Sequence, residues 1–187
     1  MRFLIDVDGP VANLMDGFAT FFWNVTSERL DPFRSSTHRI SQSPELADLH
    51  ARFDLDALLT EFLSIRDVYQ RFVPLTHGAW ESIHDLLELG HEVGFVTATL
   101  KTAPSSYASK LLWLRDIFPD VPMLAVAADQ KHWVTGDYAI DDRYDTCLRW
   151  RLEGVTPLLF RLPWNEAPPN EPSYDWKEIM KAVSDGV

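Results

Sequence analysis

The chain has 187 residues, of which 46% are hydrophobic, and it contains seven tryptophans and eleven phenylalanines. This is enough apolar material for the core of one domain, or of one domain with an insert. The formal net charge is −11 at pH 7, which argues against binding of duplex nucleic acid, because phosphate neutralisation needs clustered Lys and Arg. A small anionic substrate needs only a few well-placed cations.

The sequence also bears on compartment and membrane association. Its one cysteine, Cys147, excludes an intrachain disulfide. The first predicted strand begins directly after Met1, which leaves no room for a signal peptide, and the apolar runs are too short to span a membrane. We therefore expect a cytoplasmic protein with no membrane partner.

The first predicted strand ends in Asp6-Val7-Asp8-Gly9. Alternate side chains of a strand point to opposite faces, so Asp6 and Asp8 converge only if the chain leaves the strand just after Asp6. Gly9 and the proline that follows it favour that break. Two carboxylates at the carboxyl end of a strand suit Mg²⁺ and phosphate chemistry, since open α/β sheets hold their sites there.

Residues 10–90 carry helical signals and no strand pattern. Apolar side chains at three- and four-residue spacing predict a helix over residues 11–25. Further helices are predicted over residues 55–62 and 78–89. The stretch 26–42 is polar and has no clear period, and we interpret its Arg34–Arg39 cluster as a solvated loop rather than a phosphate contact.

From Glu92 onward the pattern changes to short apolar runs separated by helices. Strands are predicted over residues 93–97, 123–127, 137–140 and 156–160, and helices over 105–118 and 174–183. This alternation predicts parallel strands joined by crossover helices. The fold class is therefore α/β, with a core domain of residues 1–9 and 91–187 and a helical cap domain of residues 10–90 inserted after the first strand.

Two more strand ends carry polar side chains. Thr97 ends an interior strand, so that its hydroxyl and the backbone amides after it are expected to face the same crevice and hold phosphate. Asp141 and Asp142, followed by Arg143, end a later strand and add carboxylates to an oxygen-rich site of the kind that Mg²⁺ prefers. Each feature alone is common in turns and helix caps, but their conjunction in this order favours a site.

Two lysines are candidates for the compensating positive charge. Lys110 lies in the helix after Thr97, and its side chain can lean back toward the amino end of that helix. Lys131 lies ten residues before Asp141, in the predicted loop that precedes the strand. The spacing alone leaves both open.

In this order the residues resemble the four sequence motifs of the haloacid dehalogenase (HAD) superfamily of phosphatases. The chain is most similar to the 5'(3')-deoxyribonucleotidase group, through residues 3–13, Ile140-Asp-Asp-Arg143, Pro163-Trp-Asn165 and Trp176. The resemblance implies a Rossmann-like core with a parallel sheet and a small helical cap. It also implies Mg²⁺-dependent hydrolysis of (deoxy)nucleoside monophosphates to nucleoside and phosphate.

The resemblance further implies a role for each acidic residue. Asp6 would be the nucleophile that forms an aspartyl-phosphate, and Asp8 would be the acid and base. Mg²⁺ would be held by Asp6, the backbone carbonyl of Asp8 and Asp141, with Asp142 in support.

The same resemblance bears on how the phosphate is held. Thr97 and a lysine would hold its oxygens, and Lys110, which precedes Trp113 and Phe118 as in the group, is preferred over Lys131. The mammalian members have Ser-Pro after the threonine, whereas this chain has Ala98-Thr99, so one hydroxyl is replaced and the Ala98 amide remains available. Arg143 completes the set of expected substrate contacts.

The cap is expected to select the substrate. Tyr69, Phe72 and Trp80 are the candidates for stacking on a nucleobase, while Phe18 and Phe22, at helical spacing, are expected in the cap core. Two alternatives stay open: a HAD phosphatase of another small metabolite, and a catalytically silent protein that binds phosphate or nucleotide. Base preference, phosphate position, sugar type and a homodimeric state are also left open.

Overall fold

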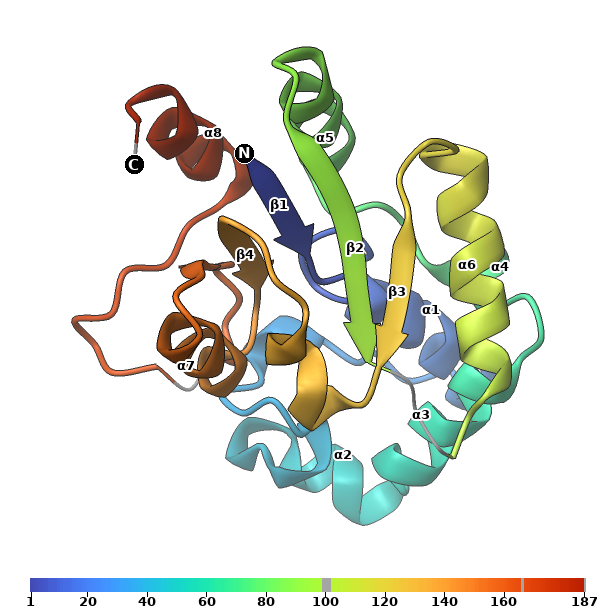
Figure 1. The fold of residues 1–187 in the computed structure, drawn as a ribbon. Helices are drawn as coiled ribbons and strands as arrows, with labels where there is room; N and C mark the ends of the chain where they lie inside the picture. Colours follow the sequence, from blue (N-terminus) through green and yellow to red (C-terminus); the bar gives the residue numbers. More distant parts are fainter. Residues whose placement is uncertain (99–101, 166, 187) are drawn as a thin grey trace.

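The computed structural model describes residues 1–98, 102–165 and 167–186. Five parallel strands form one sheet in the order β3-β2-β1-β4-β5 (Figure 1). Their bounds are β1 (Arg2–Ile5), β2 (Glu92–Ala98), β3 (Met123–Val126), β4 (Tyr138–Asp141) and β5 (Thr156–Leu159). The predicted strands and the α/β class are thereby confirmed.

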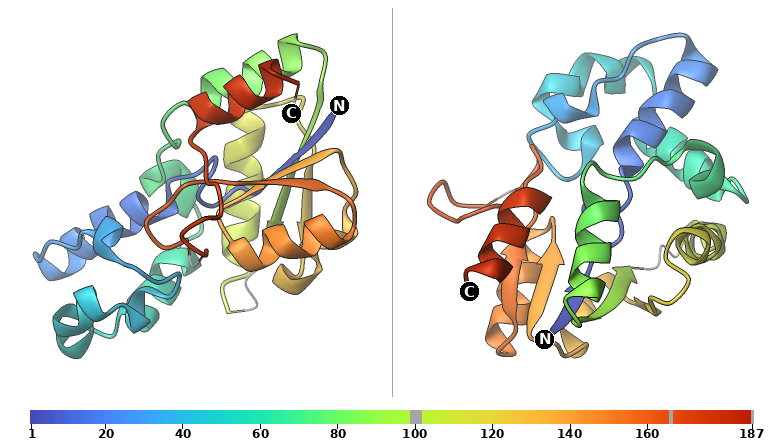
Figure 2. Two further views of the ribbon diagram at one scale, coloured as in Figure 1. Left: turned by 90° about the vertical axis from the view of Figure 1, so that its left-hand side faces the viewer. Right: turned by 90° about the horizontal axis from the view of Figure 1, so that it is seen from above.

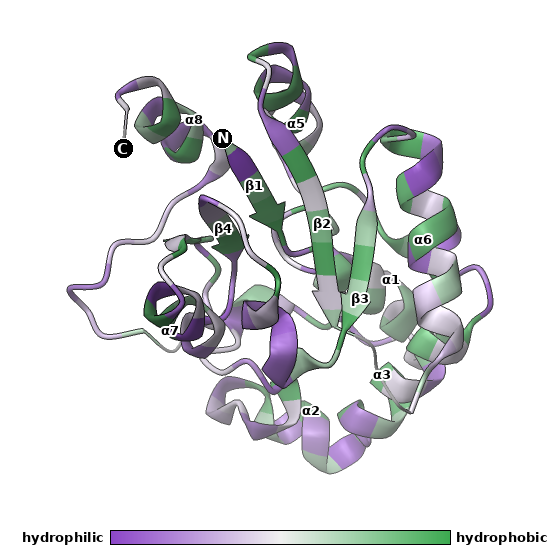
Figure 3. Ribbon diagram, viewed as in Figure 1, coloured by the Kyte–Doolittle hydropathy of each residue, from purple (hydrophilic) through white to green (hydrophobic). Residues whose placement is uncertain are grey.

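Helices cover both faces of this sheet. The helices α5 (Ala79–Glu88), α6 (Ser105–Ile117) and α8 (Trp176–Ser184) pack on one face, and α7 (Tyr144–Leu152) packs on the other (Figure 2). The alternation of side chains along β1 divides the core accordingly: Phe3 and Ile5 face the first set, whereas Leu4 packs with Trp150 of α7. Figure 3 shows the apolar stretches along β2 and β3 beside the mixed polar and apolar surface of α6.

The residues between β1 and α5 form four helices over the carboxyl ends of the strands: α1 (Leu14–Thr26), α2 (Ala47–Arg52), α3 (Leu55–Ser64) and α4 (Val68–Phe72) (Figure 1). Three 3₁₀ turns join α1 to α2, at Pro32–Arg34, Ile40–Gln42 and Pro44–Leu46. Phe18 and Phe22 lie in the apolar core of this region, as expected. The 3₁₀ turns, α2 and α4 were not predicted, because segments this short show no hydrophobic period.

Helix α5 packs against β2 and α8 rather than on the four helices α1–α4. In Figure 2 it lies alongside α8, on the same face of the sheet. We therefore propose that the chain returns to the core before α5, earlier than the boundary at residues 90 and 91 expected from the sequence. Among the helices of the described residues, none is both long and apolar enough to cross a membrane.

Candidate active site

The candidate residues gather where β1, β2 and β4 end. Because the three strands are parallel neighbours, their carboxyl ends meet at the same edge of the sheet. Asp6 follows β1, Thr97 is the penultimate residue of β2, and Asp141 is the last residue of β4. The structure thus brings together the three strand ends that the sequence singled out.

The chain turns sharply after β1. The amide of Asp6 still donates to the Ile140 carbonyl of β4 (2.8 Å), but the amides of Val11 and Ala12 turn back to the Val7 carbonyl. Gly9 has a φ of +101°, and a Cβ atom there would lie 3.0 Å from the carboxyl carbon of Asp142. Only glycine fits this backbone without strain, so Gly9 lets the chain pass close to the acidic residues after β4.

Three buried carboxylates form a compact cluster at this edge. One ligand atom from each of Asp6, Asp141 and Asp142 lies within 4.8 Å of the others. Trp164 Nε1 donates to Asp142 Oδ2 (2.9 Å), and the Arg143 amide donates to Asp141 Oδ1 (2.8 Å). The Asn165 side chain also donates to the Asp142 carbonyl. Carboxylate oxygens fixed in this way fit a hard divalent cation.

Lys131 neutralises part of this cluster. Its Nζ lies 2.6 Å from Asp6 Oδ2 and 2.8 Å from Asp141 Oδ2, and the side chain is almost fully buried. Lys131 belongs to a 3₁₀ helix, Ala128–Trp133, where the sequence predicted a loop. Burial acts to lower the pKa of Lys131, but Asp141 and Asp6 outweigh it and raise that pKa. The lysine is therefore a permanent cation.

Burial raises the pKa of each carboxyl in the cluster. Burial raises the pKa of Asp6 to about 7, although Lys131 acts against the rise. Burial, with the charge of Asp6 next in size, raises the pKa of Asp142 to about 7. Burial also raises the pKa of Asp141. Without a second cation, burial and mutual repulsion thus favour protonation of these carboxyls, and a bound cation would favour their ionised form.

Asp8 has a separate set of partners. Tyr69 Oη of α4 donates to Asp8 Oδ1 (2.5 Å), and Lys110 Nζ of α6 donates to Asp8 Oδ2 (2.7 Å). The same Nζ donates to Thr97 Oγ1 (2.7 Å). Tyr69, Lys110 and Thr97 are buried, and burial followed by the charge of Asp8 raises the pKa of Tyr69 well above its usual value. The two lysines therefore hold different carboxylates: Lys131 contacts Asp6 and Asp141, and Lys110 contacts Asp8.

A cavity of about 490 Å³ opens beside the two aspartates of the β1 loop. Its charged lining residues include Asp6, Asp8, Lys131 and Asp142. Most of the lining area is apolar, and the apolar residues include Leu14, Met15, Pro32, Phe33, Ile40, Leu59, Leu63 and Trp164. The Phe33 and Trp164 rings stack at the wall, with centroids 5.8 Å apart. The cavity thus offers both charged groups for an anionic group and apolar surface for a ring system.

The expected substrate contacts divide into two sets. Ala98, Lys131 and Arg143 line the cavity, and the Arg143 guanidinium also pairs with Asp145 (2.9 Å). Thr97, Lys110 and Tyr69 lie behind Asp8 and are not among the described residues that line the cavity. Thr99 lies outside the described residues.

The other two aromatic candidates lie away from the described part of the cavity wall. Phe72 packs edge-on against Phe21 and Phe62 in the apolar core under α1 and α3. Trp80, on α5, is 47% exposed and lies against His84, with ring centroids 4.1 Å apart. Neither ring is placed to stack on a molecule bound in the cavity.

The cavity wall is instead built by a segment that the sequence did not single out. Ser35, Thr37 and His38 line the cavity. The interpretation of the Arg34–Arg39 cluster as a solvated loop is wrong for Ser35, which is buried, whereas His38 is exposed as expected. The buried residues Pro32 and Ile40 anchor the segment on either side. Apolar residues that flank a polar run were the available signal, but they show no period from which burial can be read.

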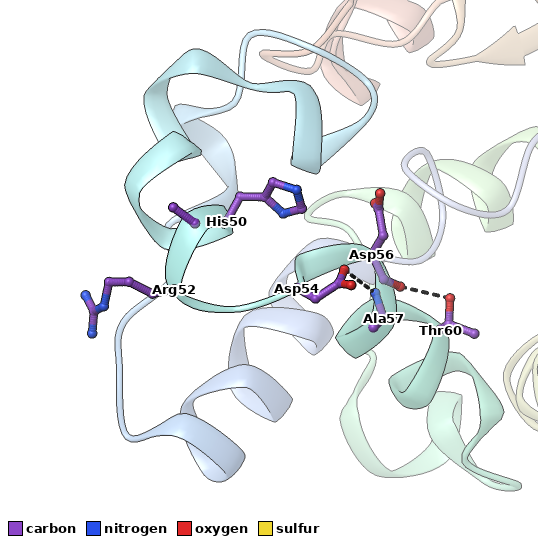
Figure 4. Close-up of a pocket in the computed structure, with 7 residues that line it drawn as sticks. His50, Arg52, Asp54, Asp56, Ala57 and Thr60 are labelled. Atoms are coloured by element: carbon purple, nitrogen blue, oxygen red, sulfur yellow. Dashed lines mark hydrogen bonds between the residues drawn. The ribbon is translucent and has the colours of Figure 1, made fainter.

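A second hollow of about 750 Å³ lies on α2 and α3 (Figure 4). Its side chains point in different directions: Asp54 caps α3 through the Ala57 amide (3.0 Å), and Thr60 donates to the Asp56 carbonyl (2.8 Å). His50 and Arg52 point away from each other (Figure 4). Since these groups do not converge, the hollow offers no chemistry comparable to that of the cavity beside Asp6.

Comparisons with known proteins agree with this geometry. Two Bordetella proteins, each named "Putative 5'(3')-deoxyribonucleotidase", are 29% (B. pertussis) and 28% (B. bronchiseptica) identical to this chain. Each alignment covers 98% of this chain and 96% of the relative.

Solved structures of hydrolases share the fold. One from Pseudomonas syringae has a TM-score of 0.55 at 14% identity and covers 100% of this chain and 99% of its own. Another, from Streptococcus pneumoniae, has a TM-score of 0.58 at 10% identity over 86% of this chain and 92% of its own. The α/β architecture is that of the HAD hydrolases.

A model of one protein family matches residues 1–184, nearly the whole chain. The family is described as 5' nucleotidase, deoxy (pyrimidine), cytosolic type C protein (NT5C). The match includes every strand of the sheet and each strand end that carries the acidic residues. The chain therefore belongs to this nucleotidase family of the HAD phosphatases, whose members act on small phosphomonoesters.

Proposed function

We propose that the protein hydrolyses (deoxy)nucleoside monophosphates to nucleoside and phosphate through an aspartyl-phosphate on Asp6. The observation that supports this proposal is the cavity, whose lining combines Asp6 and Asp8 with a largely apolar surface. The carboxylates suit phosphate chemistry, and the apolar surface suits a nucleoside. The names of the Bordetella relatives support the same substrate class.

The donor set suits Mg²⁺. Asp6, Asp141 and Asp142 offer hard oxygen ligands within a small volume, and octahedral oxygen coordination is the preference of this ion. The backbone carbonyl of Asp8 is a further candidate ligand. When bound, the ion would neutralise the carboxylates and the phosphate, so that the two anions can approach each other.

Asp6 is the proposed nucleophile. Its carboxylate attacks phosphorus as the bond to the nucleoside oxygen breaks, and water later releases the phosphate from Asp6. Lys131 lies 2.6 Å from Asp6 and lines the cavity, so it is a candidate to hold the incoming phosphate as well. We therefore assign the phosphate-neutralising role to Lys131 and not to Lys110, which contacts Asp8 and Thr97 instead.

Asp8 is the proposed acid and base. It gives a proton to the nucleoside oxygen in the first step and takes one from the attacking water in the second. The Asp8 side chain is 31% exposed and lines the cavity, so it can reach both oxygens. The Ala98 amide, at the end of β2 and on the cavity wall, remains a candidate for contacts to the phosphate, whereas the Thr97 hydroxyl is bonded to Lys110 behind Asp8.

Phosphate release from a panel of 5'- and 3'-(deoxy)nucleoside monophosphates and sugar phosphates, with and without Mg²⁺, tests the proposal. We expect turnover of deoxynucleotides that requires Mg²⁺ and is lost in Asp6→Asn. Turnover of sugar phosphates alone would keep the mechanism and reject the substrate class. No turnover of any compound would reject the proposed function in favour of a silent binding protein.

A further inference from the structure

Both oxygens of the Asp8 carboxylate are held by buried donors from two different helices. Tyr69 Oη donates to Oδ1 (2.5 Å) from α4, and Lys110 Nζ donates to Oδ2 (2.7 Å) from α6. A carboxylate with a single partner can rotate about its last bond, whereas one held at both oxygens has a fixed plane. The orientation of Asp8 is therefore set by residues outside its own loop.

The two donors are fixed to each other by a third set of contacts. The Tyr69 amide donates to Ser109 Oγ (3.0 Å), Ser109 Oγ donates to Gln70 Oε1 (2.7 Å), and Gln70 Nε2 donates to the Ser109 carbonyl (3.0 Å). Ser109 directly precedes Lys110 in α6. The same turn of α6 thus positions both the helix that carries Tyr69 and the lysine.

The aromatic ring of Tyr69 completes the arrangement. It packs against Trp113 of α6, with centroids 5.8 Å apart, and Lys110 Nζ lies 5.3 Å from the Tyr69 ring centroid. Tyr69 is 1% exposed and is not among the described residues that line the cavity. Tyr69 therefore has no route to the substrate except through Asp8, and a role in stacking on a base does not fit its position.

We propose that Tyr69 is a positioning residue for proton transfer, which with Lys110 holds Asp8 toward the leaving oxygen of the substrate. This inference rests on the proposed function, since it assumes that Asp8 is the acid and base. As the bond from oxygen to phosphorus breaks, the Asp8 proton moves to the nucleoside oxygen and negative charge develops on Asp8. The Tyr69 hydroxyl keeps its own proton and stabilises that developing charge with a stronger hydrogen bond.

The role predicts a dependence on the leaving group. A nucleoside leaves as a poorly stabilised alkoxide and needs a proton, whereas p-nitrophenolate leaves without one. The quantity to measure is kcat/KM, because it reports the steps up to the transfer of phosphate to Asp6 and omits the later attack of water. A residue that only supports the fold affects both substrates alike.

The experiment compares kcat/KM for a deoxynucleoside monophosphate and for p-nitrophenyl phosphate in Tyr69→Phe. The variant keeps the ring packed on Trp113 and removes only the hydroxyl. We expect kcat/KM to fall about 10- to 100-fold for the nucleotide and less than about 3-fold for p-nitrophenyl phosphate. Tyr107→Phe is the matched control: Tyr107 is a half-buried tyrosine of α6, the helix that carries Lys110, and this variant should match the wild type with both substrates.

Two further variants test the positioning role of Tyr69 and the acid and base role of Asp8 separately. Ser109→Ala loosens α4 from α6 and should reproduce the pattern of Tyr69→Phe more weakly. Equal losses for both substrates in Tyr69→Phe, or no loss for either, would overturn the positioning role. Asp8→Asn tests the assumption separately: if it keeps full nucleotide turnover, the acid and base role of Asp8 in the proposed function fails as well.

Discussion

The two lysines of the active site show how one site can use the same residue type for two purposes. Lys131 lies among carboxylates of the core, bonded to Asp6 and Asp141, which are held by neighbouring strands. Lys110 joins Asp8 to Thr97 and lies against Tyr69, which belongs to the region inserted after β1. Lys131 thus balances charge at the edge of the sheet, whereas the contacts of Lys110 depend on how the inserted helices pack on the core.

The largest loss of activity is expected from substitution of Asp6 or Asp8, to which we assign different chemical roles. Asp6→Asn should lower kcat by at least about 10⁴-fold for every substrate, because the nucleophile is lost. Asp8→Asn should lose nucleotide turnover but still release a burst of about one p-nitrophenol per protein from p-nitrophenyl phosphate. Rapid-mixing absorbance measurements check this. A burst from Asp6→Asn would contradict the assignment of the nucleophile.

Removing Lys131 is expected to cost stability as well as activity. Lys131→Met leaves Asp6 and Asp141 buried without a cation, and breaking a buried ion pair costs about 3–5 kcal/mol. Urea unfolding at pH 8 without metal measures the loss in the free energy of unfolding. Mg²⁺ should restore part of it, because the ion replaces the missing charge. A variant as stable as the wild type without metal would show that Lys131 does not balance this cluster.

The cavity wall predicts a smaller, substrate-specific effect. Phe33→Ala removes half of the stacked Phe33–Trp164 pair and should raise KM for nucleotides about 10-fold, with little change for p-nitrophenyl phosphate. Steady-state kinetics with both substrates check this. Trp80→Ala is the control, since Trp80 is exposed on α5 away from the cavity wall. A larger effect in Trp80→Ala than in Phe33→Ala would relocate the nucleoside site.

The smallest predicted effect is a pH dependence of stability. The folded-state pKa values of Asp6 and Asp142, about 7, lie above the ordinary 3.8, so the folded protein binds protons that the unfolded chain releases. Without metal, stability from these groups is full below about pH 4 and is lost as the pH rises through about 7.

Thermal unfolding with and without Mg²⁺, between pH 5 and pH 8.5, measures this. The gain in Tm from Mg²⁺ should grow with pH, by about 2–4 °C for each kcal/mol recovered. In Asp142→Asn, the gain in Tm from Mg²⁺ should increase less with pH. A gain that is the same at every pH would show that these carboxyls are already ionised at pH 5 in the metal-free protein.

The strands and the residues at their ends can be predicted from the sequence because their patterns are local. Short apolar runs predicted the strands, and parallel strands bring Asp6, Thr97 and Asp141 to one edge whatever the helices do. The placement of these three residues therefore followed from the order of the elements alone.

The partners of Asp8 and the cavity wall could not be found in this way. Tyr69 lies in a five-residue helix and contacts Asp8, which is 61 positions away in the chain. No periodic pattern in the sequence predicts such a contact. Which carboxylates Lys110 and Lys131 contact depends on how α6 and the 3₁₀ helix pack on the sheet. Tertiary packing decides these contacts.

One matched comparison tests most directly whether Lys131 holds the phosphate and Lys110 positions Asp8. We would measure kcat/KM of Lys131→Met and Lys110→Met, with Mg²⁺, for a deoxynucleoside monophosphate and for p-nitrophenyl phosphate. We expect Lys131→Met to lower both values by a similar factor, of order 10²–10³, and Lys110→Met to lower mainly the nucleotide value. Equal losses for both substrates in Lys110→Met would contradict these separate roles.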